Sequence, residues 1–126
     1  MEFKQEQLES MSDFELSVVA AKLFLPCDYI VNDKNKSVEL ANYQDAMIHG
    51  MHDQVLTPYA GYNPCGSWSD CGDLIDDCNI GLDPTNFGGE VEWFARPEFR
   101  NEILTMDKNP KRAVTIAYIL VKQSNG

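Results

Sequence analysis

Three of the four cysteines and four aspartates fall within twenty residues, in the stretch NPCGSWSDCGDLIDDCNIGL at positions 63–82. Thiolates and carboxylates bind metals, and closely spaced thiols also carry redox chemistry. Cys65, Cys71 and Cys78 are separated by five and six residues, unlike the short C-x2–4-C pair of zinc sites. On a helix, Cys71 and Cys78 would lie roughly 10 Å apart, too far for one tetrahedral metal ion. The spacing therefore favours cysteines that serve as small core residues.

The same stretch predicts an amphipathic helix that begins after Ser67 or Ser69, either of which can serve as its N-cap. Its apolar positions have helical spacing: Cys71, Leu74, Ile75 and Cys78. Its polar side carries Asp70, Asp73, Asp76 and Asp77. These carboxylates do not follow the register of a calcium-binding EF-hand loop, so we interpret them as a solvated face that can meet a basic partner surface. Trp68 either packs over the helix start or serves as an aromatic anchor for that partner.

The two histidines form a second candidate ligand set. His49 and His52 lie three residues apart, which places both on one face of a helix, and Asp53 follows directly. A divalent metal can bind such a set, but Gly50 weakens a helix there and the H-E-x-x-H pattern is missing. We therefore expect a solvated loop and no metal or other cofactor.

Three cations gather at the start of the last predicted helix: Lys108, Lys111 and Arg112. Free N–H groups at a helix start bind anions, while the helix dipole disfavours cations there, so compensating groups are expected. We favour internal carboxylates as these groups. A bound phosphate, nucleotide or carboxylate is the alternative, and it defines a second functional hypothesis, an anion-binding pocket.

Local signals define the elements of the first half of the chain. Ser12 and Glu15 form a capping box, and apolar residues with helical spacing follow until the helix ends before Pro26. Residues 1–10 are expected to fray or to add one helical turn. The strand-like runs 29–31 and 37–40 surround a polar turn and predict a β-hairpin. Residues 43–62 are predicted to form an irregular insertion, with a short helix that Gly50 interrupts.

The second half adds a strand and a helix. EVEWFAR, residues 90–96, alternates apolar and polar side chains and predicts a strand, whereas RPEFRNEILTMD, residues 96–107, is ambiguous, with a weak helical signal. Asn109 and Pro110 suit an N-cap and a first helical position. The expected buried face of that helix consists of Ala113, Ile116, Ala117 and Leu120, broadened by Tyr118 and Val121. The pattern predicts a single α+β domain, residues 1–126, in which about three helices pack with a small antiparallel β-sheet.

The charge balance excludes some partners. Acidic residues outnumber basic ones 20 to 10, for a formal net charge of −10. Such a surface repels nucleic acid and anionic membranes, so neither is expected as a direct partner. The longest apolar run, residues 113–121, is shorter than the roughly 20 residues that span a bilayer, and the first residues do not have the pattern of a signal peptide. We expect a protein of the host cell cytoplasm.

Three blocks in this order, SDFEL, then NPCGSWSDCGDLIDDCNIGL, then KNPKRAVTIAYILV, resemble the NinX family of lambdoid phages and prophages. The matching positions are Ser12-Asp13-Phe14-Glu15, Asn63-Pro64, Ser69-Asp70, Leu74-Ile75, Asn79-Ile80, Asn109-Pro110 and Arg112-Ala113. The chain departs from the family pattern in the insertion at 43–62 and in its clustered cysteines. The resemblance implies a phage accessory protein and supplies no catalytic residues.

No nucleophile motif, P-loop or dinucleotide-binding glycine pattern is found in the sequence. We therefore expect a small, acidic, non-enzymatic accessory protein that binds a host or phage protein. The expected contact residues are Trp68, Asp70, Asp73, Asp76 and Asp77. The anion-binding or nucleotide-binding pocket is the alternative, and a metal-dependent enzyme is the least favoured. The sequence sets neither the identity of the partner nor the oligomeric state.

Overall fold

The computed structural model describes residues 2–125, with the backbone alone for residues 48, 87 and 125. Along this part of the chain the elements are α1 (Gln5–Glu9), α2 (Asp13–Phe24), β1 (Tyr29–Asn32), β2 (Ser37–Ile48), β3 (Met51–Tyr62), α3 (Trp68–Cys78), β4 (Ile80–Phe87), β5 (Glu90–Pro97), β6 (Thr105–Asp107) and α4 (Pro110–Asn125). The strands form two antiparallel sheets, in the orders β1-β2-β3 and β4-β5-β6. This arrangement confirms the predicted α+β class, with two sheets where one was expected.

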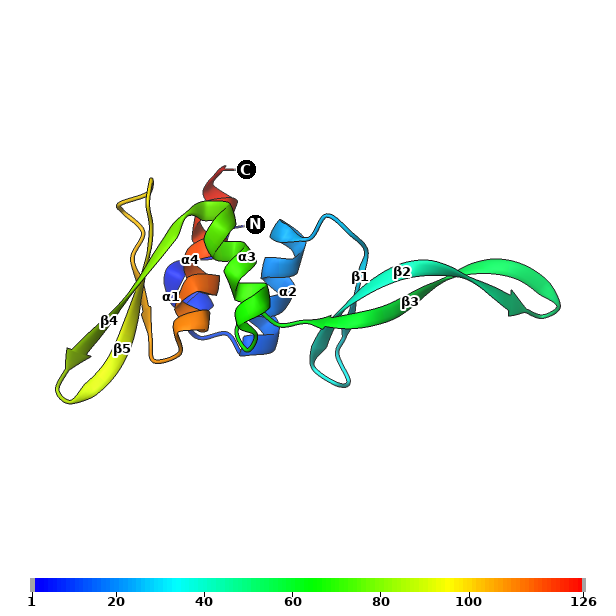
Figure 1. The fold of residues 1–126 in the computed structure, drawn as a ribbon, viewed down its shortest axis with the longest axis horizontal. Helices are drawn as coiled ribbons and strands as arrows, with labels where there is room; N and C mark the ends of the chain where they lie inside the picture. Colours follow the sequence, from blue (N-terminus) through cyan, green and yellow to red (C-terminus); the bar gives the residue numbers. More distant parts are fainter. Residues whose placement is uncertain (1, 126) are drawn as a thin grey trace.

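The helices form the body of the molecule (Figure 1). The β4–β5 hairpin lies on one side of this body, and the β2–β3 hairpin extends far beyond it on the other side. β2 and β3 therefore contact the helices only near their base, where β2 packs against α2.

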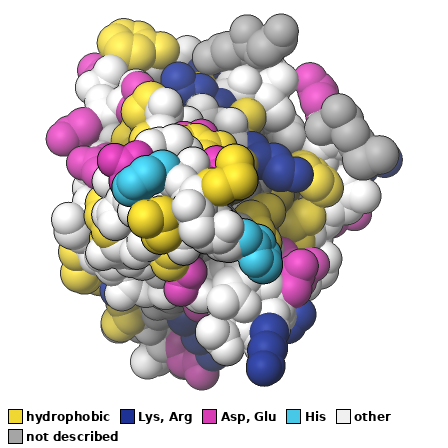
Figure 2. Space-filling model, turned by 90° about the vertical axis from the view of Figure 1, so that its right-hand side faces the viewer, with side chains coloured by type: hydrophobic (Ala, Val, Ile, Leu, Met, Phe, Trp, Pro, Cys, Tyr) yellow, Lys and Arg dark blue, Asp and Glu magenta, His cyan; other side chains and the backbone are white. Residues whose placement is uncertain are grey.

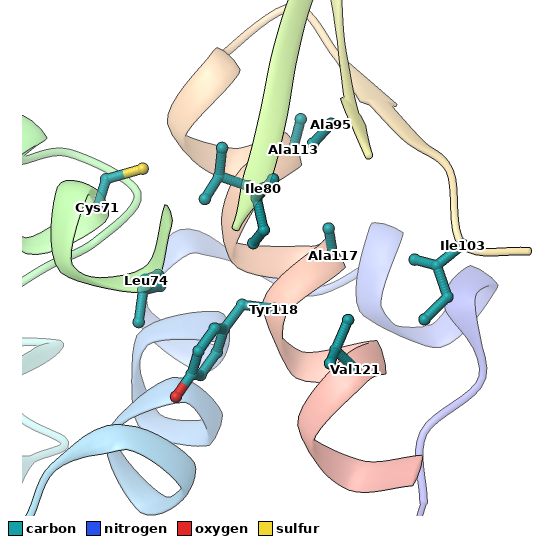
Figure 3. Packing of buried hydrophobic residues seen from close by; sticks show 10 residues of the cluster. Cys71, Leu74, Ile80, Ala95, Ile103, Ala113, Ala117, Tyr118 and Val121 are labelled. Atoms are coloured by element: carbon teal, nitrogen blue, oxygen red, sulfur yellow. The ribbon is translucent and has the colours of Figure 1, made fainter. Parts of the chain in front are cut away.

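Helix α4 is the centre of the core. Residues 113–119 are all fully buried, and seven consecutive residues cover every face of a helix. The sequence predicts a helix with one buried face, but all faces of this segment are buried, because α1, α2, α3 and the second sheet surround α4. Burial on all sides also explains why this helix consists of residues such as Val, Ile and Thr, which favour strands. Figure 3 shows Tyr118 reaching from α4 toward Leu74 of α3.

Helix α2 begins as the sequence predicts. The Ser12 hydroxyl accepts the Glu15 N–H, and the Glu15 carboxylate accepts the Ser12 N–H at 3.0 Å. Residues 5–9 form helix α1, and Leu8 is completely buried against α2 and α4. The expectation that residues 1–10 fray is therefore wrong for this segment, and the alternative of an extra helical turn is correct.

Residues 43–62 are not an irregular insertion. They form the outer part of a regular hairpin, in which β2 and β3 pair from Val38 opposite Tyr62 to Ile48 opposite Met51. We call residues 42–61 the arm. None of the side chains described within the arm is buried, so the hydrophobic core does not hold it in place.

The turn of the arm shows why the short helix predicted there does not form. His49 and Gly50 both have positive φ, 52° and 77°, as a two-residue hairpin turn requires. Gly50 thus ends a strand rather than interrupting a helix. Pro58 lies beside a bulge in β3, the outer strand of its sheet, where its missing N–H breaks no ladder hydrogen bond.

The second sheet covers one side of α4. β4 and β5 meet at a turn in which Gly88 and Gly89 have φ of 65° and 89°, and the predicted strand at 90–96 is confirmed as part of β5. The segment 96–107, which the sequence leaves ambiguous, is not helical: it contains the end of β5, turns and β6, which pairs with β5. Thr105 of β6 is buried and donates its hydroxyl to the Ala113 carbonyl at 2.6 Å, which ties the sheet to the start of α4.

Candidate interaction site

Helix α3 confirms the predicted separation of the cysteine-rich stretch into two faces. Ser67 is the N-cap, and its hydroxyl accepts the Asp70 N–H. Asn79 ends the helix with a φ of 51°, the left-handed conformation that asparagine tolerates. Cys71 and Leu74 are completely buried, while Ile75 and Cys78 pack partly buried against the same cluster.

The cysteines are free thiols, and two of them belong to the core. Cys65, which precedes the helix, is buried beneath α1, α2 and α4. Burial raises the pKa of the Cys65 thiol to about 11 and that of the Cys71 thiol to about 12, so neither forms a nucleophilic thiolate at neutral pH. Among the described residues, no three His, Cys, Asp or Glu side chains gather as a metal site would require.

The four aspartates of α3 do not form one free acidic face. Asp70 accepts the Asn63 N–H at 2.9 Å, which ties the helix start to the end of the arm. Asp77 accepts both the Tyr118 hydroxyl at 2.8 Å and the Lys122 ammonium at 3.0 Å. The Lys122 hydrogen bond, assisted by Tyr118, lowers the pKa of Asp77, so this carboxylate stabilises the fold until the pH falls through that lowered pKa. Asp73 and Asp76 are exposed and make no ion pair within the described part of the chain.

Trp68 lies within the first turn of α3, one residue after the cap rather than before it. Its side chain is 52% exposed, and the Lys111 ammonium lies 4.6 Å from the centroid of its ring. Both interpretations of Trp68 therefore hold in part, because Lys111 packs on the ring while half of the residue stays open to solvent. The cation–π contact restrains the indole in the free protein.

The cations at the start of α4 are already engaged. Arg112 is 14% exposed and pairs with Asp13 at 2.8 Å and with Asp107 at 3.1 Å. Its guanidinium also donates to the carbonyls of Glu9 and Met11. These contacts confirm the expected internal carboxylates for Arg112.

The other two cations of this group lie at the surface. Lys108 pairs with Glu90 at 3.1 Å, and Lys111 lies over Trp68. An anionic ligand at the start of α4 would have to compete with the internal partners of Lys108, Lys111 and Arg112. The geometry therefore gives the anion-binding hypothesis no specific support.

The histidines lie at the end of the arm rather than on a helix. His49 is in the turn and His52 is in β3 opposite Met47. The helical spacing that would place both histidines on one face as a ligand set is therefore wrong. Figure 2 looks toward this end of the molecule and shows both histidine side chains among apolar side chains. Reasoning from the sequence missed this surface. The residue pair His49-Gly50 was a usable signal, because both residue types tolerate the positive φ that a two-residue hairpin turn requires.

A cleft of about 380 Å³ opens beside the first turn of α3. It lies between the starts of α2 and α3 and the base of the arm, and Lys36 crosses it with its ammonium 5.5 Å from the Phe14 ring. Tyr62 also lines the cleft and is 3% exposed, and its hydroxyl has no hydrogen-bond partner among the described residues. Burial raises the pKa of Tyr62 well above its usual value, so the hydroxyl stays neutral.

Replacing Tyr62 by phenylalanine is expected to raise the free energy of unfolding by about 1 kcal/mol. A buried hydroxyl without a partner loses its hydrogen bonds to water on folding and gains no bond in the protein, and phenylalanine removes this cost. The measurement is urea unfolding of the two proteins. Tyr118→Phe is the matched control, since its hydroxyl is also buried but is bonded to Asp77, and it should lower stability by a similar amount. A destabilised Tyr62→Phe protein would mean that a water molecule satisfies this hydroxyl.

The residues that carry the family resemblance bond to one another across the fold. Besides the Asp13–Arg112 ion pair, Asn63 joins α2 and α3 through Ser17 at 3.4 Å and Asp70 at 2.9 Å. Asn109 donates its amide to the Cys65 carbonyl at 3.0 Å. These positions hold the starts of α2, α3 and α4 together, so their chemistry is structural in the free protein.

The fold and this site define an α+β protein whose third helix presents a half-exposed tryptophan in its first turn and, further along, two exposed carboxylates that make no ion pair within the described residues. A sequence model of the family described as Bacteriophage P22, NinX matches residues 8–122. The chain therefore belongs to the NinX family of phage proteins, which confirms the resemblance seen in its three sequence blocks. Comparison with curated proteins gave no match, and comparison with solved structures gave none either. Within the described residues, no helix is long and apolar enough to cross a membrane.

Proposed function

We propose that this phage protein acts in the host cytoplasm by binding a host or phage protein through the start of α3. The observation that carries the proposal is the half-exposed Trp68, held by Lys111 in the absence of any partner. Covering the remaining half of an indole buries on the order of 100 Å² and contributes about 2–3 kcal/mol, the scale of an interface hot spot. Because the ring is already restrained, its ordering costs little on binding.

The charges of the same helix define the kind of partner. Asp73 and Asp76 are exposed and have no ion-pair partner among the described residues, so they can pair with lysine or arginine of another protein. The net charge of −10 would speed the approach of a basic surface and repel nucleic acid. We leave Asp70 and Asp77 out of the proposed contact, because their carboxylates already accept hydrogen bonds from Asn63 and Tyr118. The proposed role is binding, without a catalytic step.

The test is capture of partners from infected cells with the tagged protein, followed by purification of the captured protein and measurement of its Kd. We expect Trp68→Ala combined with Asp73→Asn and Asp76→Asn to weaken binding about 100-fold. The wild-type complex should also associate more slowly as salt rises, since the steering is electrostatic.

A matched control removes the same groups elsewhere. Tyr59 on the arm is 57% exposed, and Asp33 and Asp83 are exposed carboxylates away from α3. Tyr59→Ala with Asp33→Asn and Asp83→Asn makes the same change in net charge and should leave the Kd unchanged. Equal binding by the α3 variant and the control would refute the proposed surface, provided that both keep the thermal midpoint of the wild type.

A further inference from the structure

The arm presents a large unpartnered surface that the α3 site does not use. It extends away from the body in Figure 1, and no side chain described within it is buried. Four of its large apolar residues are more than half exposed: Tyr43, Met47, Met51 and Tyr59. A lone two-stranded hairpin is marginally stable in water, so a strand added from outside would stabilise it.

The two edges of the arm differ. β1 pairs with β2 from Ser37 to Leu40, and the Ala41 N–H donates to the Asp28 carbonyl. From residue 42 outward, neither outer edge of the arm pairs with another described strand. The β3 edge is protected, because Pro58 has no N–H and Tyr59 is the extra residue of a bulge. The β2 edge from 42 to 48 contains no proline, lysine or bulge, and Asp45 is its one charged residue. This edge is open to pairing with another strand.

The distribution of charge favours a second copy of this chain as the occupant. The arm contains two of the twenty acidic residues, Asp45 and Asp53, while the other eighteen and all ten basic residues lie elsewhere. The bodies of two copies repel one another, but antiparallel arms place those bodies roughly 35 Å apart. That separation is several times the Debye length of about 8 Å at physiological salt. The arm has only two carboxylates and no lysine or arginine with which a strongly charged partner could form ion pairs.

We infer that β2 of one copy pairs antiparallel with β2 of a second copy across a two-fold axis, joining two arms into one four-stranded sheet. An open edge is complementary to itself in this arrangement, since each strand offers the same donors and acceptors to the other. Tyr43 and Met47 project from β2 and pack across the new strand pair. The contact buries on the order of half of the roughly 800 Å² per partner of a standard interface, so the expected Kd is micromolar.

Sedimentation of the full chain across concentrations tests this inference. The wild type should shift from 14.2 kDa toward twice that mass at micromolar concentration. Tyr43→Asp with Met47→Asp places like charges along the paired edge and should weaken association at least about 30-fold. Pairing Tyr43 opposite Met47 also sets Asp45 of the two copies opposite one another. Raising salt from about 50 to about 500 mM should therefore strengthen the wild-type dimer, because it screens the repulsion between these two carboxylates.

The control lies on the other strand of the same arm. Met51→Asp with Tyr59→Asp makes the same change in charge at comparably exposed residues, and it should change the dimer Kd less than about threefold. Equal loss in both variants would overturn the assignment to the β2 edge. A wild type that stays monomeric up to about 0.5 mM, far above the expected Kd, would overturn self-association itself.

If Tyr43→Asp with Met47→Asp unfolds the hairpin, hydrogen exchange of the wild-type protein still tests the dimer. In the wild type, outward N–H groups of residues 42–48 should become protected as concentration rises, while the outer edge of β3 should not. Protection that does not depend on concentration would count against the dimer. The inference is independent of the proposed α3 surface: Trp68→Ala with Asp73→Asn and Asp76→Asn should dimerise as the wild type does.

Discussion

Replacing Arg112 by methionine is expected to lower the free energy of unfolding by about 3 kcal/mol. The guanidinium is 14% exposed and links α4 to Asp13 at the start of α2, to Asp107 in β6, and to the carbonyls of Glu9 and Met11. Methionine keeps much of the apolar stem but leaves Asp107, itself only 26% exposed, without its partner. Urea unfolding monitored by circular dichroism measures the loss.

The control for Arg112 removes the same charge at the surface. Lys108 pairs with Glu90, and both side chains are about two-thirds exposed at 68% and 65%. Lys108→Met should therefore leave stability unchanged within error, since exposed pairs contribute little. Arg112→Lys keeps the charge but cannot make the forked contacts, so it should retain only a small part of the stability. Similar losses for Arg112→Met and Lys108→Met would contradict the structural role of Arg112.

Truncating Tyr118 to alanine should cost still more, about 4 kcal/mol. This side chain is completely buried at the centre of the largest cluster, where its ring meets Phe24 edge-on with centroids 6.0 Å apart. Alanine leaves a cavity between α2, α3 and α4 and removes the hydroxyl that Asp77 accepts. Thermal and urea unfolding should both show the loss.

Two further variants divide the Tyr118 effect into its parts. Tyr118→Phe keeps the ring and should cost about 1 kcal/mol, because Asp77 retains Lys122 as a partner. Leu23→Ala removes an apolar side chain that is 37% exposed on α2, and it should cost clearly less than Tyr118→Ala. If Tyr118→Ala and Leu23→Ala were equally destabilising, α4 would not be the packing centre described above.

Both predictions bear on function, because they separate the residues that build the fold from those left for a partner. Arg112, Asp70 and Asp77 are engaged in internal contacts, so substitutions there would impair binding only through stability. Trp68 in the first turn of α3, and Asp73 and Asp76 further along the same helix, remain available to a partner. The arm, which extends away from the body, is a second available surface.

Local signals in the sequence were sufficient where short-range chemistry decides the structure. The capping box of Ser12 and Glu15, the helical stripe of Cys71 and Leu74, and Asn79 at a helix end act within a few residues. The structure has each of them as predicted. The same is true of the α+β class, which follows from the order of such elements.

Interpretation failed where the same residues suit two local structures. A glycine such as Gly50 disfavours a helix and also permits a hairpin turn, and only the pairing of β2 with β3 selects the turn. The exposed arm gave no clear pattern, since neither face packs on a core that would impose an alternation of apolar residues.

The sequence by itself determined the class of the fold, the helix boundaries set by caps, and membership of the NinX family, because these depend on residue types and spacing along the chain. Only the tertiary structure decided which charges are free. Arg112 and Asp13 are 99 residues apart in sequence, and Tyr118 and Asp77 are 41 residues apart. Folding brings the bonded atoms of each pair within 3 Å of one another. The acidic, cysteine-rich stretch thus became a helix with a buried apolar face, two carboxylates in internal contacts and two left to solvent.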